Sequence, residues 1–324
     1  MRIKQLKIEG FRSLKNVTWE PGDLNILIGP NGSGKSNLLR FLELMAIAAR
    51  GGLGKAVQSS GGMNSLVWNG SSPAITFMLE AIPPDHFHDP EHYELEMVRL
   101  GSGSAYRINH ELLANFARVR TGELPRPFKF LERTQQRASV FDENERGFVA
   151  PPETVPEDET LLSIATGPFV HNRRIAPFQQ QLSGISVYAN LDVSRTALIR
   201  QSAVTRTEYR VEQDGSNLIS VLHTLYTGDR NFESTVDVAM RAAFGDNYEK
   251  LVFPPAADQR IQLRVRWKTI ETTSADLSDG TLRFLFLLTV LASPDPPPVI
   301  AIDEPETGLH PAMLPIIAEY AVEA

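Results

Sequence analysis

The pattern of apolar and polar residues divides the chain into two regular ends and a less regular middle. Near the N-terminus, β-strands are predicted for the apolar and β-branched runs "IKQLKI", "NVTWE", "LNILI" and "AITFMLEAI". Residues 36–50, "SNLLRFLELMAIAAR", are apolar nearly all round and stop at Gly51 and Gly52. This segment predicts a buried helix that ends at the two glycines.

Regular patterns return after Gly215. The run "GSNLISVLHTLY" predicts a helix with Ser216 as its N-cap, and "FESTVDVAMRAAFG" predicts a helix that ends at a glycine. The run "RIQLRVRWK" alternates strictly, so it predicts a strand with one apolar and one polar, mainly basic face. The apolar face carries Ile261, Leu263, Val265 and Trp267, and the other face carries Gln262, Arg264, Arg266 and Lys268.

The middle of the chain mixes short strand and helix patterns, with no internal repeat and no sustained heptads. It includes the proline- and acid-rich run "APPETVPEDET", which predicts a mobile loop. We therefore expect three regions: an N-terminal lobe at 1–90, an inserted subdomain at 91–212 and a C-terminal lobe at 213–324.

Composition and charge narrow the classes of function. The 324 residues include no cysteine, which excludes disulfides, thiolate metal sites and cysteine nucleophiles and fits an intracellular protein. The net charge of −7 argues against a uniformly basic nucleic-acid-binding surface. The longest apolar run, "FLFLLTVLA", is well short of the ~20 residues that cross a bilayer. We expect a cytoplasmic protein with no membrane partner.

The run "GPNGSGKS" satisfies the phosphate-loop (Walker A) pattern between a predicted strand and a predicted helix. Glycines let backbone N–H groups close around phosphates, and the helix N-terminus adds positive potential. Lys35 is predicted to reach the β and γ phosphates as a catalytic cation, and the Ser36 hydroxyl to bind Mg²⁺. The predicted loop and its flank comprise Gly29, Pro30, Asn31, Gly32, Ser33, Gly34, Lys35, Ser36 and Asn37.

Two adjacent carboxylates follow the apolar run "VIAI". Asp303, at the end of a parallel strand beside a phosphate loop, is predicted to bind Mg²⁺ directly or through water. Glu304 is the candidate base that polarises the attacking water. Taken alone, such a pair favours a helix cap, but the phosphate loop in the same chain favours the catalytic interpretation.

The run "LSDGTLRFLFLLTVLA" predicts a helix with Ser278 as N-cap and with Asp279 and Gly280 in its first turn. A helix N-terminus with a small hydroxyl residue and a glycine is a second predicted anion site. A capped core helix is the alternative interpretation of this run taken by itself.

The order phosphate loop, "LSDGT" and "IAIDEPETGLHP" resembles the ABC-type ATPase head, in the branch of RecF, the structural maintenance of chromosomes (SMC) proteins and the OLD-family ATPases. "IEGFRSLKN" resembles the same branch. The resemblance covers residues 1–82 and 213–324. It implies an α/β P-loop NTPase head with an N-terminal antiparallel β-subdomain, a central, mostly parallel sheet and an inserted mixed helical and β region.

The resemblance also implies how the site works. Two heads sandwich two ATP molecules, so Ser278 and Gly280 of one protomer touch the γ-phosphate bound by the other, and "TGLHP" lies at the dimer seam. It places Arg12 of "FRS" near the nucleotide, and a glutamine that binds the metal is expected, for which Gln58 is the candidate. Asp279 departs from the glycine of many relatives and adds negative charge near a phosphate.

A second departure lies at the C-terminus. The family has a further strand ending in a switch residue, usually histidine, that contacts the γ-phosphate, whereas this sequence ends after "HPAMLPIIAEYAVEA". His310 belongs to the dimer-seam motif instead. We expect a trimmed chain, because a parallel sheet that stops here leaves an unpaired edge.

Two functions from different classes remain open. The first is an ATPase that uses ATP and Mg²⁺, forms a homodimer on ATP and is coupled to DNA maintenance, DNA repair or anti-phage defence. The second is a regulatory module whose nucleotide state controls a partner nuclease or toxin with slow turnover, and a transporter motor is third. DNA contact is left open for the basic face above and for Arg195, Arg200, Arg206 and Arg210.

Overall fold

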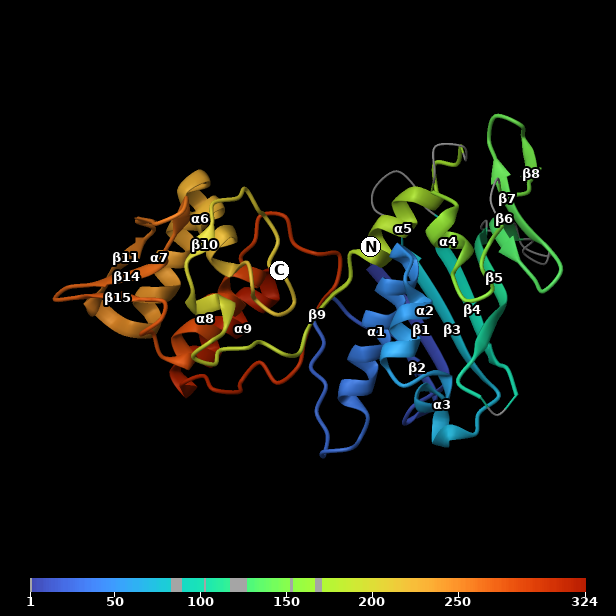
Figure 1. Cartoon of the computed structure of the whole chain (residues 1–324), viewed down its shortest axis with the longest axis horizontal. Coiled ribbons are helices and arrows are strands. Elements are labelled where there is room, and N and C mark those ends of the chain that lie inside the picture. The colour runs from blue at the N-terminus through green and yellow to red at the C-terminus, as the bar shows by residue number, and fades with distance from the viewer. Residues whose placement is uncertain (1, 83–88, 102, 117–126, 152–153, 167–170) are drawn as a thin grey trace. The chain divides into compact units, whose positions relative to one another are not determined.

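The computed structural model divides the chain into two compact units, residues 1–185 and 186–324 (Figure 1). This division falls inside the region 91–212 that the sequence pattern set apart. Among the described residues, none of the helices has the length and apolar character that a bilayer span requires. The structure describes residues 2–82, 89–101, 103–116, 127–151, 154–166 and 171–324.

The first unit is built on an eight-stranded sheet in the order β2-β1-β3-β4-β5-β6-β7-β8, with every neighbouring pair antiparallel. The predicted N-terminal antiparallel sheet is thereby confirmed, and strands from beyond residue 90 extend it. The strands are β1 (Arg2–Phe11), β2 (Leu14–Trp19), β3 (Ala74–Ile82), β4 (Glu91–Arg99), β5 (Tyr106–Phe116), β6 (Pro127–Arg133), β7 (Ala138–Asp142) and β8 (Gly147–Val149).

Helices cover one face of this sheet, and in Figure 1 α1, α2 and α5 lie in front of its strands. Helix α1 buries nine of its 16 residues, as its nearly all-round apolar sequence predicts. The C-cap Gly51 has φ 84°, a conformation that favours glycine, so the predicted end of this helix is confirmed. The helices are α1 (Lys35–Arg50), α2 (Leu53–Ser59), α3 (Met63–Leu66), α4 (Leu161–Ile164) and α5 (Ile175–Ser183).

Aromatic rings join α1 to the sheet and to α5. The Phe41 ring of α1 lies 5.0 Å from Phe11 of β1 and 5.3 Å from Phe77 of β3, measured between ring centroids. The series continues from Phe77 to Tyr93 at 6.0 Å and from Tyr93 to Phe178 of α5 at 5.5 Å. Tilted and edge-on pairs at these separations add to the burial of the rings, so this row is the centre of the first core.

The acidic run predicted to be a mobile loop is anchored. Its described part has no regular secondary structure, but the Glu159 carboxylate accepts from the N–H groups of Gly52, Leu53 and Gly54 at 2.9, 3.0 and 3.1 Å. Thr160 is fully buried and caps α4. The composition of this segment predicts mobility, but tertiary contacts fix its C-terminal part. Residues 152–153 of the segment lie outside the described residues.

The strand predicted at "LNILI" does not form. Residues 25–30 have no regular secondary structure, and Leu24, Ile26, Leu27 and Ile28 are 42% to 91% exposed. A strand needs a neighbour to take its backbone hydrogen bonds, and no described strand pairs with this segment. Parallel pairing occurs, among the described residues, between β9 (Ser186–Tyr188) and β16 (Ile300–Ile302), so the expected central parallel sheet is seen only in part.

The second unit packs helices around α8, in which ten of 13 residues are buried. Two three-stranded antiparallel sheets, β10-β13-β12 and β11-β14-β15, accompany these helices. The strands are β10 (Ala203–Val204), β11 (Tyr248–Val252), β12 (Pro255–Ala256), β13 (Arg260–Ile261), β14 (Arg264–Trp267) and β15 (Glu271–Thr273). The helices are α6 (Leu218–Gly228), α7 (Arg230–Phe244), α8 (Asp279–Leu291) and α9 (Leu314–Glu323).

Local predictions in this unit mostly hold. Helix α7 ends at Gly245 with φ 70°, and alternation along 261–265 buries Ile261, Leu263 and Val265. The single strand predicted for this run is wrong, because β13 and β14 belong to different sheets. The predicted cap Ser216 is wrong, because α6 begins after Asn217 and Ser216 donates its backbone N–H to Asp214 in the preceding turn at 2.9 Å. Asn and Ser side chains can make the same hydrogen bonds in turns and at helix caps. The sequence alone therefore does not indicate which of Ser216 and Asn217 precedes the first helical residue.

Replacing Phe41 by alanine tests the aromatic row. Phe41 is fully buried between two strands, so Phe41→Ala is expected to lower the free energy of unfolding by about 3–5 kcal/mol. Denaturant unfolding followed by circular dichroism measures the change. Phe148→Ala is the matched control, because Phe148 is 45% exposed and its loss is expected to change stability by less than about 1 kcal/mol. Equal losses for both variants would contradict this account of the core.

Candidate functional site

The predicted phosphate loop joins the exposed segment 25–30 to the start of α1. Gly32 has φ 82° and Gly34 has φ 102°, both in the left-handed region that favours glycine. A Cβ on Gly34 would lie 2.8 Å from the Ser13 hydroxyl oxygen, and one on Gly29 would lie 2.9 Å from that of Ser33. The glycines are therefore required by backbone conformation at Gly32 and Gly34 and by close approach at Gly29 and Gly34.

Lys35 folds back over this loop. Its Nζ donates to the Gly29 carbonyl oxygen at 2.6 Å and to that of Pro30 at 3.2 Å. The first backbone N–H groups of α1 lack partners within the helix and carry the positive end of its dipole. An ammonium group and a helix N-terminus thus lie at one short loop, an arrangement that suits a polyanion.

The turn after β1 packs beside the loop. Ser13 accepts a hydrogen bond from Asn37 Nδ2 at 2.8 Å, and the neighbouring Arg12 has a left-handed backbone with φ 46°. Among the described residues, Arg12 Nε is buried without a hydrogen-bond partner. Burial, and then the positive charge of Arg40, lower the pKa of the Arg12 guanidinium. An anion beside Arg12 would relieve both effects.

The remaining predicted residues of the first unit lie at the surface. Ser36 is exposed in the first turn of α1, and Pro30, Asn31 and Ser33 are exposed in the loop. Gln58 is exposed on α2, and its metal-binding role stays a prediction.

The carboxylate pair follows a parallel strand pair in the second unit. Strand β16 runs beside β9, and the Asp303 N–H extends this ladder by donating to the Tyr188 carbonyl oxygen at 3.0 Å. Glu304 then turns away with φ 48°, a conformation that non-glycine residues adopt at an energetic cost. Its Oε2 accepts from the Thr307 hydroxyl at 3.2 Å. The chain leaves the strand abruptly, and backbone strain lies at the predicted base.

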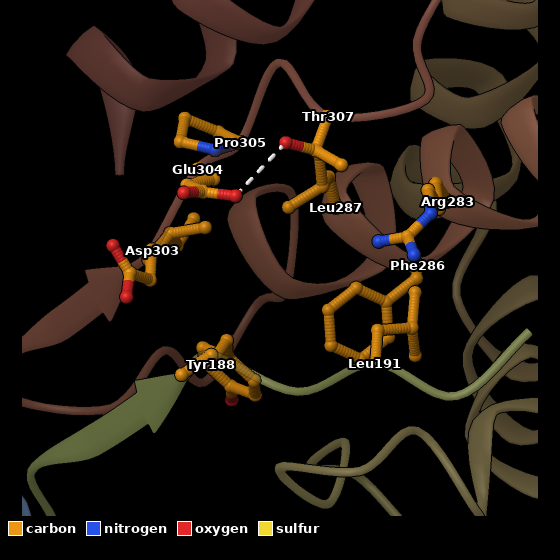
Figure 2. A pocket seen from close by; sticks show the side chains of 11 residues that line it. Tyr188, Leu191, Arg283, Phe286, Leu287, Asp303, Glu304, Pro305 and Thr307 are labelled. Carbon is orange, nitrogen blue, oxygen red and sulfur yellow. Dashed lines mark hydrogen bonds between the residues drawn. The ribbon is translucent and has the colours of Figure 1, made fainter. Parts of the chain in front are cut away.

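A pocket opens at this strand end (Figure 2). Asp303 and Glu304 project from the end of β16, and Arg283 reaches the pocket from α8. Arg283 was not singled out from the sequence, in which it is one arginine within an apolar helix. The lining residues are Tyr188, Ala189, Leu191, Arg283, Phe286, Leu287, Ile302, Asp303, Glu304, Pro305 and Thr307.

Helix α8 begins as predicted. The Ser278 hydroxyl oxygen accepts from the Thr281 N–H at 3.1 Å, which confirms Ser278 as the N-cap. A Cβ on Gly280 would lie 2.8 Å from the Gly308 carbonyl oxygen, so Gly280 allows "LSDGT" and "TGLHP" to pack together. His310 accepts from the Ala312 N–H at 3.2 Å and caps the next turn.

The basic residues considered for DNA contact differ from one another in their surroundings. Arg200 is buried, at 8% exposure. Arg266 and Arg264 both face Glu271, at 2.6 and 3.6 Å, and Arg210 faces Asp295 at 3.1 Å. Arg266 and then Arg264 lower the pKa of the Glu271 carboxyl. The side chains of Arg195, Arg206 and Lys268 are exposed.

The predicted metal ligands fall in both units. Ser36 belongs to the first and Asp303 to the second. Within the described part of the chain, no group of three or more His, Asp or Glu side chains is arranged to hold a metal ion. A hydroxyl and a carboxylate are the kinds of hard oxygen donor that Mg²⁺ takes, so each residue taken by itself is chemically suited to that ion, and their joint role stays a prediction.

Models of two protein families match the chain. Residues 1–55 match the model described as "AAA ATPase domain". Residues 200–323 match the model described as "AAA domain, putative AbiEii toxin, Type IV TA system". The first match contains the phosphate loop, and the second contains Ser278, Gly280 and the carboxylate pair.

RecF proteins are similar over a short stretch. The chain is 36% identical over 74 residues to "DNA replication and repair protein RecF" of Moorella thermoacetica, which covers 22% of this chain and 18% of that protein. It is 45% identical over 49 residues to the protein of the same name in Staphylococcus haemolyticus, covering 15% of this chain and 13% of that one. The matched stretch thus spans less than a fifth of either relative.

A solved structure is similar over the whole chain. It is titled "Crystal structure of the SmcHead bound to the C-winged helix domain of ScpA", and the match has a TM-score of 0.55 at 15% identity. The match covers 100% of this chain and 86% of that one. At this identity the likeness is one of fold.

Lys35→Ala tests the phosphate loop. The change removes an ammonium group that lies among the loop carbonyls, and loss of its charge-assisted hydrogen bonds is expected to weaken ATP binding at least about tenfold. Calorimetric titration with ATP and Mg²⁺ measures the affinity. Lys55→Ala is the control, because Lys55 is exposed on α2, and it is expected to bind as the wild type does. An unchanged affinity in Lys35→Ala would remove the basis for this site.

Proposed function

We propose that the chain, which matches ATPase-domain models and is similar to RecF proteins in sequence and to an SMC head in fold, is an ABC-like P-loop ATPase that binds and hydrolyses ATP and dimerises on ATP. The observation that carries this proposal is the phosphate loop at the start of α1. Its left-handed glycines and the inward-folded Lys35 form a cradle for phosphate oxygens. Arg12, with a buried and unpartnered Nε among the described residues, adds a donor beside that cradle.

The hydrolytic step is assigned to the carboxylate pair. Mg²⁺, when bound, neutralises phosphate charge, with Ser36 and Asp303 as its proposed protein ligands. Glu304 accepts a proton from the attacking water as the base. The Thr307 hydroxyl donates to the Glu304 carboxylate, whereas Asp303 is joined to Tyr188 through its backbone N–H, so the two acids differ in their surroundings. Neighbouring acids in the sequence are thereby available for two different tasks.

Dimerisation is assigned to the surface that "LSDGT" and "TGLHP" share. Gly280, in the first turn of α8, is in close contact with Gly308, and Ser278 caps the same helix. The N-terminus of α8 offers backbone N–H groups and positive potential to an anion. We propose that this anion is the γ-phosphate held by a second copy of the chain, with Ser278 and Gly280 completing that copy's site.

We propose a role in DNA maintenance, DNA repair or anti-phage defence. The names of the RecF relatives support the first two, and the family description that mentions a toxin supports the third. The alternative is a nucleotide-gated module that controls a partner nuclease or toxin. One observation favours this alternative: Arg200 is buried, Arg210 faces Asp295, and Arg264 and Arg266 share the one carboxylate of Glu271, so most of the candidate DNA contacts already have a counter-charge nearby.

Neutralising the two acids one at a time separates their tasks. Glu304→Gln keeps shape and metal binding but removes the base, so ATP is expected to bind while hydrolysis slows at least ~100-fold. Asp303→Asn weakens a metal ligand, so the affinity for MgATP is expected to fall. Phosphate release measures turnover and calorimetry measures binding. If Glu304→Gln hydrolyses ATP as fast as the wild type, Glu304 is not the base.

DNA binding distinguishes the two functions. If ATP-bound protein holds DNA through phosphate contacts, its affinity is expected to fall steeply with salt, because counterions are released. Fluorescence anisotropy with duplex DNA at several salt concentrations measures this. Arg195→Ala together with Arg206→Ala is expected to weaken binding, whereas Arg266→Ala, which is paired with Glu271, is the matched control. No salt-sensitive DNA binding with ATP present would favour the gating module.

A further inference from the structure

The guanidinium of Arg200 is buried in a ring of main-chain carbonyls. Its Nε donates to the Val193 carbonyl oxygen at 2.9 Å, and its Nη1 donates to that of Leu277 at 2.7 Å. The same Nη1 lies 3.2 Å from the carbonyl oxygens of Ser274 and Ala275. One side chain thus satisfies several carbonyls of the segment that leads into α8, a segment that otherwise has no regular structure to pair them.

The segment also binds back to Arg200. The buried Ser274 hydroxyl donates to the Arg200 carbonyl oxygen at 2.9 Å. Reciprocal bonds of this kind fix both the side chain and the backbone of the arginine, so the segment 274–277 has little freedom to shift. Because Leu277 directly precedes Ser278, the position of the α8 N-cap depends on this arrangement.

Arg200 makes one further contact, with the carboxylate of Asp279, through Nη2. The Arg200 side chain is 6% exposed, whereas that of Asp279 is 68% exposed. The ion pair therefore links a buried cation to the face on which Ser278 and Gly280 lie. Asp279 stands where the family resemblance leads one to expect glycine, and its negative charge would repel a phosphate approaching α8.

We infer that Arg200 is a positioning residue for the γ-phosphate contact, and this rests on the trans role proposed above for Ser278 and Gly280. Arg200 holds the backbone that sets the direction of the α8 N-terminus. It also supplies the positive charge that compensates Asp279, so an acidic residue is tolerated at an anion-binding helix end.

The test is self-association driven by a non-hydrolysable ATP analogue with Mg²⁺, measured by sedimentation velocity on the full chain. Arg200→Met keeps much of the side-chain volume but leaves Asp279 unpaired, so self-association is expected to weaken at least about tenfold. Binding of the analogue to the monomer, measured at a concentration where the protein does not associate, is expected to stay within about twofold, because the hydrogen bonds of Arg200 within the described structure involve neither the phosphate loop nor Asp303.

A charge rescue separates positioning from mere stability. Asp279→Asn in the Arg200→Met protein removes the unpaired charge, so it is expected to recover at least about threefold of the lost association. Arg241→Met is the matched control, because Arg241 faces Asp237 at 3.9 Å on the surface of α7 with 54% of its side chain exposed. Thermal unfolding of each variant shows what fraction of the protein is folded at the assay temperature.

Each outcome bears on the inference. Weaker association in Arg200→Met with recovery in the double variant supports it. If Arg200→Met lowers only the unfolding temperature, or if Asp279→Asn recovers nothing, Arg200 is a structural residue and the inference is wrong. If the wild type does not associate with the analogue while Lys35-dependent binding persists, the proposed trans role fails and takes this inference with it.

Discussion

The close approach between the turn after β1 and the start of α1 determines the geometry of the phosphate loop. Gly34 has no side chain, so the Ser13 hydroxyl lies where a Cβ contact would be only 2.8 Å. Asn37 donates to that same hydroxyl at 2.8 Å. Further along the helix, the Phe41 ring lies between Phe11 and Phe77. Helix α1 is thus held at its first turn by Ser13 and near its middle by two aromatic rings of the sheet. These contacts fix the direction of the N–H groups at its N-terminus.

In the second unit, a glycine at the start of a helix likewise allows a close approach by another segment. Gly280 at the start of α8 meets the Gly308 carbonyl oxygen, where any side chain would collide with it. The buried face of α8 anchors the helix in the core, so its N-terminus has a fixed direction. Glu304, one turn before Gly308, adopts a left-handed backbone that the parallel strand and the Thr307 bond keep in place. The motifs "LSDGT" and "TGLHP" therefore pack against each other on one surface of the second unit.

The role of each arginine in this protein depends on the groups that its side chain contacts. The arginines of the region 195–210 and of the strand at 264–266 look alike in the sequence, yet Arg200 is enclosed by carbonyls and Arg266 is paired with Glu271. Desolvation penalises a buried guanidinium unless hydrogen bonds and a counter-charge compensate it. Arg200 has hydrogen bonds to carbonyl oxygens and a counter-charge. The counter-charge is Asp279, whose negative charge would otherwise oppose the binding of an anion at the start of α8.

Elements that depend on a local side-chain pattern or on the conformation of single residues could be predicted from the order of residues alone. The burial of α1, its end at Gly51, the alternation along 261–265 and the Ser278 cap all follow from spacing, glycine conformation and hydrogen bonding within a few residues. Three outcomes became visible in the folded chain alone. Residues 25–30 lack a strand partner among the described residues, Glu159 anchors an acidic loop to α2, and Arg200 is buried against Asp279. These outcomes join residues that lie far apart in the chain, and strand pairing and the burial of a charge depend on which distant groups are present to satisfy them.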